Sequence, residues 1–447
     1  MMNKLFLCGL ICCLCVSPAA ADFDPFSVYD AQAPEGCVDP DIGKSALGLS
    51  DLIQIGICNN PLLNKGYMAV KTAEAGYGSA QSEYLPSVSV SGSVSAAHQK
   101  WQDAGSDRTD PYAANVGLSW LLYDFGGRSA RTDKMRAYLD AAQFSYKSLL
   151  SDTILEINQA YFNLLSAQEV LKSAQTSEES YQKAYEEARR RFDLGFASAS
   201  DKLLARTSYE QSKLAVIRAK NAVKQNQGTL AVLLNLSPNT AFKLERPDRK
   251  KDIGKLETTM KVEEMMETAL AQRSKMKKAR SDLEAARQDV RQAQSGAIGS
   301  IKLTGATGYD NDMRASAYKV GSSVGIGVSV PLFTGFADTY NIAQARYQMQ
   351  QAQYAVADTQ DAIRNEVWTA YQNYQTAVAA HDVAKRVLDS AKENERVAFA
   401  SYQVGKENIL NLLTASSQFA SARQELIVAY YSVLIGKATL YKAVGGF

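Results

Sequence analysis

The chain has 447 residues, with 49 Lys and Arg against 47 Asp and Glu, so its net charge is close to zero. A nucleic-acid-binding protein needs a strongly basic surface, and this balance argues against that class. The two histidines, His98 and His381, lie far apart in the sequence, which argues against a histidine-based metal centre or a Ser-His-Asp triad. The sequence also has no recognisable catalytic nucleophile, phosphate-binding loop or metal-ligand cluster. We therefore expect no cofactor, no metal site and no enzymatic activity.

The ten prolines are unevenly distributed, and none occurs in residues 112–237 or 332–447. Proline interrupts helices, and an ordinary multidomain enzyme of this length needs many turns. Two long proline-free stretches of similar character predict a duplicated, elongated and mainly helical protein.

Residues 1–21 have the features of a secretory signal peptide. Lys4 precedes an apolar run from Leu5 to Val16 that is too short to span a bilayer, and residues 19–21 are all alanine. We expect cleavage before Asp22. No later segment reaches the ~18 consecutive apolar residues of a transmembrane helix.

A bacterial lipoprotein signal is the alternative, because Cys12, Cys13 and Cys15 lie in the same segment. Lipidation normally requires a small residue before the cysteine, and none of the three has one. Of the six cysteines, only Cys37 and Cys58 then remain after cleavage. In an exported protein we expect these two to form a disulfide that ties an N-terminal arm, residues 22–48, to the first helix. Two separate buried thiols are the alternative.

The rest of the chain is a tandem duplication. A first repeat spans residues 49–236, a second spans 261–447, and a charged equatorial connector, 237–260, lies between them. Matching tripeptides and dipeptides recur in the same order in both repeats: Ala80-Gln81-Ser82 with Ala293-Gln294-Ser295, and Ala160-Tyr161 with Ala370-Tyr371. Internal repetition of this kind determines the fold.

Each repeat is predicted to contain two β-strands, at about 86–97 and 112–123 in the first and about 299–309 and 319–332 in the second. In the last of these, Val324, Ile326 and Val328 alternate with glycine and serine. A half-buried soluble sheet has the same period. Strands of ~10 residues with one aliphatic face and one small, uncharged polar face favour a membrane strand that lines a lumen.

Very long helices follow the strands, at about 129–193 and 339–403. Neither contains proline or an internal glycine, and apolar residues recur every three or four positions, as in coiled coils. At 1.5 Å per residue each helix would be about 100 Å long. Gly195 and Gly405 are predicted to end these helices, and shorter helices then return at 199–234 and 409–443.

Four membrane strands cannot close a barrel, and an open sheet edge in lipid leaves backbone groups unpaired. Two copies would provide about eight strands, which enclose only side chains. Three copies would provide twelve, the smallest symmetric number expected to leave a pore. The sequence therefore predicts an obligate homotrimeric conduit.

The motifs resemble those of the TolC family of outer-membrane channel proteins. The resemblance covers nearly all of residues 49–443, and its specificity comes from the ordered set, because each motif alone is weak. The motifs are Tyr84-Leu85-Pro86, the run Leu121-Leu122-Tyr123-Asp124-Phe125-Gly126-Gly127-Arg128, Pro331-Leu332-Phe333-Thr334-Gly335, Phe192-Asp193-Leu194-Gly195 and Tyr402-Gln403-Val404-Gly405.

This resemblance implies a mainly α fold with membrane β-strands. Each protomer would contribute four strands to a trimeric twelve-stranded barrel and long antiparallel helices to a periplasmic tunnel. It also implies a place in the outer membrane of a Gram-negative bacterium, with a periplasmic adaptor and an inner-membrane transporter as partners. The cargo would be drugs or, by type I secretion, proteins. The absence of a lipidated cysteine resembles the TolC branch and favours protein export or multi-purpose use.

In the family, hydrogen bonds between helices and rings of aspartate close the periplasmic tip. Asp201 matches a family aspartate, and Tyr402 matches the tyrosine that resembles its bonding partner. The second repeat departs from the pattern: Glu407 replaces an arginine, and Asn411 and Thr414 replace two aspartates. A different latch formed by Asp201, Glu407 and Lys406 is one expectation. A helix N-terminal acid is the other interpretation of Asp201.

Two further classes of protein remain as alternatives. A periplasmic adaptor also has long helical hairpins, but one hairpin flanked by β domains is expected there. A structural coiled-coil protein would not need strands with serine and glycine on one face.

Overall fold

The computed structural model describes residues 46–101, 105–109, 111–241, 243–246, 261–312 and 318–446. The predicted signal peptide, residues 22–45 of the arm with Cys37, and residues 247–260 of the connector lie outside them. The chain divides into two compact units. The sheet unit contains, among the described residues, Met68–Phe144 and Lys277–Ala357, and the helical unit contains the described parts of Pro34–Tyr67, Ser145–Met276 and Asp358–Phe447.

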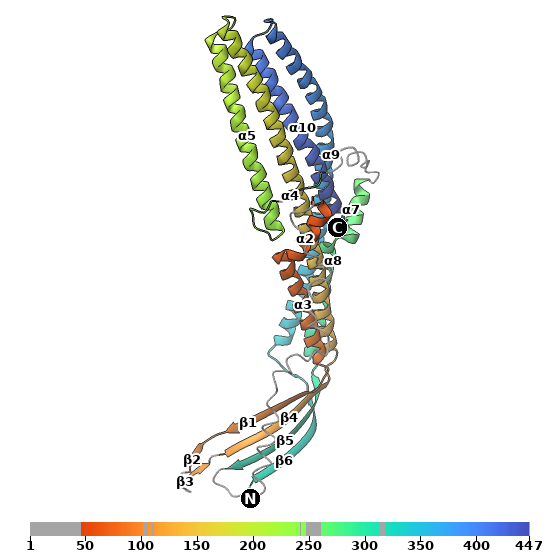
Figure 1. Ribbon diagram of the computed structural model, residues 1–447. Helices are drawn as coiled ribbons and strands as arrows, with labels where there is room; N and C mark the ends of the chain where they lie inside the picture. The colour runs from red at the N-terminus through yellow and green to blue at the C-terminus, as the bar shows by residue number, and fades with distance from the viewer. Residues whose placement is uncertain are drawn as a thin grey trace. The chain divides into compact units, whose positions relative to one another are not determined.

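Four antiparallel strands in the order β1-β4-β5-β6 form the sheet of the sheet unit (Figure 1). They are β1 (Ser87–Val94), β4 (Pro111–Tyr123), β5 (Ser300–Asp312) and β6 (Tyr318–Ser329). The edge strands β1 and β6 each have one side without a strand partner in the described chain. A separate pair, β2 (Ala97–Trp101) and β3 (Gly105–Thr109), was not predicted, because neither sequence alternates apolar and polar residues.

The strand register places the two kinds of residue on opposite faces of the sheet. One row across the strands is Ser89, Gly117, Ala306 and Ser323, and the next is Val88, Leu118, Gly305 and Val324. Every residue of β1 and β6 is exposed, and Val324 is 82% exposed. Apolar side chains usually avoid such exposure in water, so this aliphatic face fits a surface that something outside the described chain covers.

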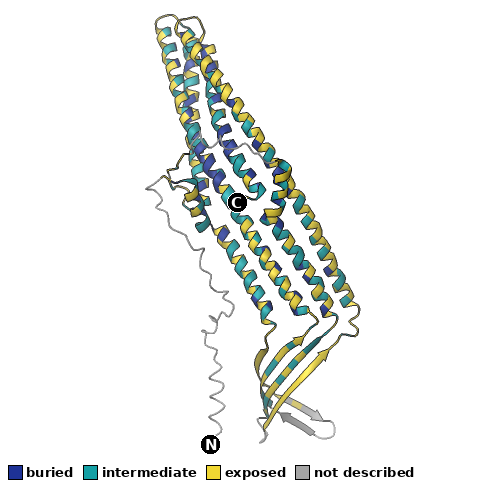
Figure 2. Cartoon of the chain, turned by 90° about the vertical axis from the view of Figure 1, so that its right-hand side faces the viewer, coloured by how far each residue is buried: buried dark blue, intermediate teal, exposed yellow. Residues whose placement is uncertain are grey.

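Each strand of the sheet continues into a long helix, and Figure 2 shows these helices side by side beyond the strands. Helix α3 (Pro61–Ser82) leads into β1, and α8 (Ser274–Gly296) leads into β5. Helix α4 (Gly127–Asp193) follows β4, and α9 (Ala337–Gln403) follows β6. The strand order therefore puts α3 and α9 at the two ends of the row.

Arg128 fixes the junction between β4 and α4. Its guanidinium donates to the carbonyl of Leu122 at 3.0 Å and lies 4.7 Å from the ring centre of Tyr84. The Asp124 carboxylate accepts from the backbone N–H of Arg128 at 2.5 Å, as an N-terminal cap does. The Ser295 hydroxyl donates to the Asp124 carbonyl. The motif that begins at Leu121 thus has a structural role.

The helical unit contains two helical hairpins. The first consists of α4 and α5 (Ala199–Leu233), and the second of α9 and α10 (Ile409–Val444). Shorter helices, α2 (Leu49–Asn59) and α7 (Val262–Gln272), pack in the same unit. Among the helices that the structure describes, none combines the length and hydrophobicity needed to cross a bilayer. Cys58 in α2 is in a disulfide, and its predicted pairing with Cys37 involves a residue outside the described chain.

A core cluster joins both hairpins to α2. It includes Leu52 and Ile55 from α2, Ile157 and Leu164 from α4, Leu230 from α5, and Tyr430 and Leu434 from α10. The apolar positions predicted at helical spacing therefore pack against neighbouring helices. Beside this region, a charge network connects four segments: Arg273 binds Glu366 at 2.7 Å, and Lys442 binds Glu366 at 3.2 Å and Asp152 at 2.7 Å.

Candidate functional site

The first helical hairpin turns at Gly195, whose φ of +78° lies in the left-handed region. The backbone N–H of Phe196 donates to the backbone carbonyl of Arg191 at 2.8 Å, and that of Gly195 donates to the backbone carbonyl of Phe192 at 3.0 Å. These two bonds form a Schellman motif, which satisfies carbonyls at the end of α4. The residue at this position must tolerate a positive φ, and glycine does so without strain.

The second hairpin repeats this geometry at Gly405, with a φ of +76°. The N–H of Lys406 donates to the Ser401 carbonyl at 2.9 Å, and that of Gly405 to the Tyr402 carbonyl at 3.0 Å. The predicted roles of the two glycines therefore agree with the backbone at both turns.

The two turn glycines provide a matched pair of variants. We expect Gly195→Ala and Gly405→Ala each to destabilise its turn by about 1–2 kcal/mol, because L-residues are strained at positive φ. A Cβ at Gly405 would lie 3.0 Å from Nη2 of Arg191, whereas one at Gly195 meets nothing within 4 Å. Gly405→Ala should therefore also displace Arg191 and lower the melting temperature further. Equal melting temperatures by circular dichroism would contradict this close approach.

Asp201 caps the returning helix α5. The Ser198 hydroxyl accepts from the Asp201 N–H at 3.1 Å, and the Asp201 carboxylate accepts from the Ser198 N–H at 3.1 Å. This reciprocal pair is a capping box. The interpretation of Asp201 as a helix N-terminal acid thus has a direct structural basis, and a gate role would be additional.

The equivalent cap of α10 uses different residues. The Asn408 side chain accepts from the Asn411 N–H at 2.8 Å, and the Asn411 amide donates to the Glu407 carboxylate. Within the described chain, the Lys406 ammonium and the Thr414 hydroxyl have no hydrogen-bond partner. Asp201 bonds to Ser198 and Glu407 to Asn411, so no described hydrogen bond joins Asp201, Lys406 and Glu407 to one another as one latch.

Arg191 instead connects the two hairpins. From the last turn of α4 its guanidinium donates to the backbone carbonyl of Tyr402 in α9, and its carbon Cζ lies 4.9 Å from the centre of the Tyr402 ring. Arg191 was not among the residues predicted from the sequence. Its position four residues before Gly195 was the available signal, but a run of three arginines also fits simple stabilisation of a helix C-terminus.

Tyr402 belongs to the apolar cluster behind this contact. The ring is 4% exposed and packs with residues of both hairpins: Ala184, Ala188, Ala205, Ile409, Leu412 and Leu413. Burial raises the pKa of Tyr402, Arg191 opposes this shift, and the carboxylates of Asp201 and Glu187 add to it. The phenol therefore remains neutral at physiological pH, although its buried hydroxyl has no hydrogen-bond partner among the described residues.

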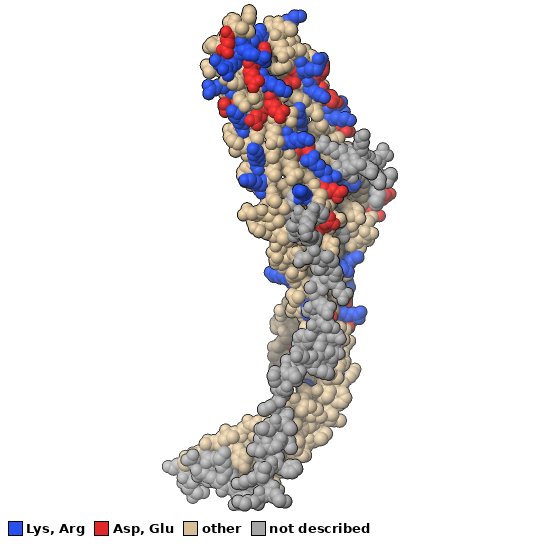
Figure 3. Space-filling model, viewed as in Figure 1, with Lys and Arg blue, Asp and Glu red and all other residues tan. Residues whose placement is uncertain are grey.

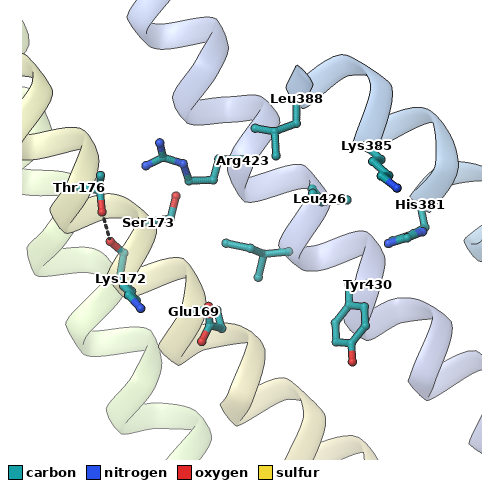
Figure 4. A pocket seen from close by; sticks show the side chains of 11 residues that line it. Glu169, Lys172, Ser173, Thr176, His381, Lys385, Leu388, Arg423, Leu426 and Tyr430 are labelled. Atoms are coloured by element: carbon teal, nitrogen blue, oxygen red, sulfur yellow. Dashed lines mark hydrogen bonds between the residues drawn. The ribbon is translucent and has the colours of Figure 1, made fainter. Parts of the chain in front are cut away.

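A groove further along the helical unit, with a volume of about 540 Å³, lies between α4, α9 and α10 (Figure 4). Leu388, Leu426 and Ile427 give it an apolar floor, while Lys172, Lys385 and Arg423 contribute positive charge. The face of the molecule drawn in Figure 3 shows that many Lys, Arg, Asp and Glu residues lie over the helical unit. The described residues contain no group of three His, Cys, Asp or Glu side chains able to hold a metal ion.

Comparison with known proteins identifies the family. The family model described as "Outer membrane efflux protein" matches residues 52–236 and 265–446, more than half of the chain. The chain belongs to the outer membrane efflux protein family. The two matched segments lie within the two predicted repeats.

Individual members of the family cover most of the chain. Protein CyaE of Bordetella pertussis is 28% identical over 418 residues, which are 92% of this chain and 86% of CyaE. Outer membrane protein TolC of Escherichia coli is 23% identical over 422 residues, 90% of this chain and 83% of TolC. The crystal structure of the outer membrane protein VceC of Vibrio cholerae matches with a TM-score of 0.77 at 18% identity, covering 89% of this chain and 96% of VceC.

Family membership confirms the TolC-like fold and the outer-membrane location predicted from the sequence. The protein is an outer-membrane efflux or secretion channel, and its helical part is periplasmic. The family and the structurally similar proteins are channel proteins.

Proposed function

We propose that this protein is the homotrimeric outer-membrane duct of an export complex. The observation that carries the proposal is the open four-stranded sheet, with an aliphatic face, a small polar face and two edges that have no strand partner in the described chain. Three such sheets joined edge to edge would form a closed barrel of about twelve strands, which leaves no edge exposed to lipid. The aliphatic face would contact lipid, and the serine and glycine face would line the pore.

The partners would be a periplasmic adaptor and an inner-membrane transporter. The energy for transport would come from the transporter. The groove is lined by three basic residues, Lys172, Lys385 and Arg423, and one acidic residue, Glu169, and its excess of basic residues offers the adaptor a site for acidic side chains. Cargo would be proteins or small molecules, according to the transporter that is recruited.

The hairpin turns would form the periplasmic gate. In the closed state, the contact between Arg191 and Tyr402 would hold the first and second hairpins together. The caps at Asp201 and Asn411 would stabilise the start of the returning helix within each hairpin. Glu407, Asn411 and Thr414 would not give the triple acidic ring of the family. The gate would therefore depend mainly on the link between hairpins.

The test is to extract the protein from membranes with detergent and to measure its native mass and its conductance in planar bilayers. We expect a mass of three copies and discrete channel openings. A protein that is monomeric in buffer without detergent would contradict the proposal and would favour a periplasmic adaptor or a structural coiled-coil protein.

A further inference from the structure

We propose that a stripe of tyrosines on α9 packs against the small-residue face of α3 in a second copy of this chain. The inference rests on the proposed homotrimer and assigns the contact that holds the copies together beyond the membrane strands. The stripe consists of Tyr340, Tyr347 and Tyr354, which are 73%, 70% and 77% exposed. Three aromatic side chains in regular array rarely remain uncovered on a soluble surface.

The stripe lies directly opposite the side of α9 that this chain already covers. Ala345 is buried, and Ile342, Met349, Ala352 and Val356 are half-buried, at the three- and four-residue spacing of a packed helix face. Tyr347 follows Ala345 by two residues, which is about 200° around a helix. Tyr340 and Tyr354 lie seven residues to either side, so that all three share one face. Helix α9 thus has two packing faces, and only one is occupied.

Helix α3 has a complementary free face. Met68, Thr72, Ala75, Ser79 and Ser82 are exposed at alternating spacings of four and three residues, whereas Tyr77, Gly78, Ala80 and Gln81 are half-buried or buried. Apart from Met68, the side chains of this face are small. Small residues form holes that accept large knobs from a facing helix.

The topology brings these two faces to the same junction between copies. Helix α3 leads into the free edge strand β1, and α9 follows the free edge strand β6. If β6 of one copy pairs with β1 of the next, α9 of the first copy must lie next to α3 of the second. The contact is heterologous, because two different surfaces of the chain meet. Such head-to-tail contacts form a closed ring when the rotation that relates neighbouring copies adds up to a full turn. All of these residues belong to the sheet unit.

Engineered disulfides test this seam. Tyr347→Cys would be combined in the same chain with Thr72→Cys, Ala75→Cys or Ser79→Cys, because the facing register is set by the strand pairing between copies. After mild oxidation, we expect at least one combination to give dimers and trimers on a non-reducing denaturing gel. Gln348→Cys is the matched control, since it is exposed but lies about 100° away on α9.

The outcomes separate the seam from the trimer. Cross-linking through Tyr347→Cys but not through Gln348→Cys supports the proposal. If native mass shows trimers while no Tyr347→Cys combination cross-links, or Gln348→Cys cross-links equally well, the seam is wrong and the trimer stands. If native mass shows no trimers, the proposed function itself fails. Replacing Tyr347 and Tyr354 together by alanine should also increase the fraction of monomer in detergent.

Discussion

Arg191→Ala is expected to raise the mean conductance of the reconstituted channel by about tenfold. The variant removes the hydrogen bond to the Tyr402 carbonyl and the cation–π contact at 4.9 Å, which join the two hairpins. A hydrogen bond from a charged donor contributes about 1.5–3 kcal/mol, and every ~1.4 kcal/mol changes a closed-to-open equilibrium tenfold. Conductance recorded in planar bilayers without the adaptor measures the effect directly.

Arg190→Ala is the matched control, because Arg190 is the preceding residue but, among the described residues, pairs only with Glu187 of its own helix, at 2.8 Å. Arg191→Lys should give an intermediate conductance, since lysine keeps the charge but has no planar fork. Equal conductance of Arg191→Ala and Arg190→Ala would remove the link between hairpins from the gate.

Asp201→Asn separates the two interpretations of Asp201. Asparagine can still accept from the Ser198 N–H, so the capping box is largely retained while the negative charge is lost. We expect a much smaller rise in conductance than for Arg191→Ala, because no described hydrogen bond joins Asp201 to the second hairpin. A rise of the same size would show that the charge of Asp201 acts in the gate.

The sequence predicted most of the fold because its patterns are long and regular. The alternation of apolar and small residues around Val324 indicates a β-strand, and the absence of proline from residues 129–193 and 339–403 indicates long helices. Both patterns depend only on neighbouring residues, so the positions of strands and helices follow from them. The strands β2 and β3 have no such pattern, and their pairing depends on the hairpin that brings them together. The free faces of α3 and α9 are visible only when exposure is known.

The candidate gate was harder to predict for a related reason. The turn glycines are local features of the sequence, each at the end of a long helical pattern. Arg189, Arg190 and Arg191 look equivalent in the sequence, but α4 directs only Arg191 towards Tyr402, while Arg190 binds Glu187 and Arg189 lies near Asp193. The choice among them depends on how two hairpins pack. Comparison with the family motif alone led to Glu407, the position where this chain departs from the pattern.

Glu366→Gln is expected to give the largest loss of stability of any single charge removal in the helical unit. The Glu366 carboxylate accepts hydrogen bonds from Nη1 and Nη2 of Arg273, at 2.7 and 3.1 Å, and from the Lys442 ammonium at 3.2 Å. Arg273 is only 7% exposed, so the variant leaves a buried cation without its counter-ion. Breaking a buried pair costs about 3–5 kcal/mol. Because the Glu366 side chain is 35% exposed, we expect about 2 kcal/mol here.

The pH dependence of the melting temperature can show that the loss of stability in Glu366→Gln comes from the lost negative charge. Burial alone would raise the pKa of Glu366, but the hydrogen bonds and charges of Arg273 and Lys442 outweigh it and lower the pKa. A lowered folded-state pKa contributes stability that is complete above the unfolded value of about 4.3 and is lost as the pH falls through the folded value. The melting temperatures of wild type and Glu366→Gln should therefore differ most near pH 7 and converge below about pH 4.

Glu393→Gln is the control for this prediction. Glu393 lies in the same helix and also pairs with an arginine, Arg396 at 2.6 Å, but both side chains are exposed to solvent. Water and salt screen such a pair, so its removal should leave the melting temperature nearly unchanged. If Glu366→Gln melts like Glu393→Gln at pH 7, solvent screens the network of Arg273, Glu366 and Lys442 as fully as a surface pair, and the network does not stabilise the packing of α7 against α9 and α10.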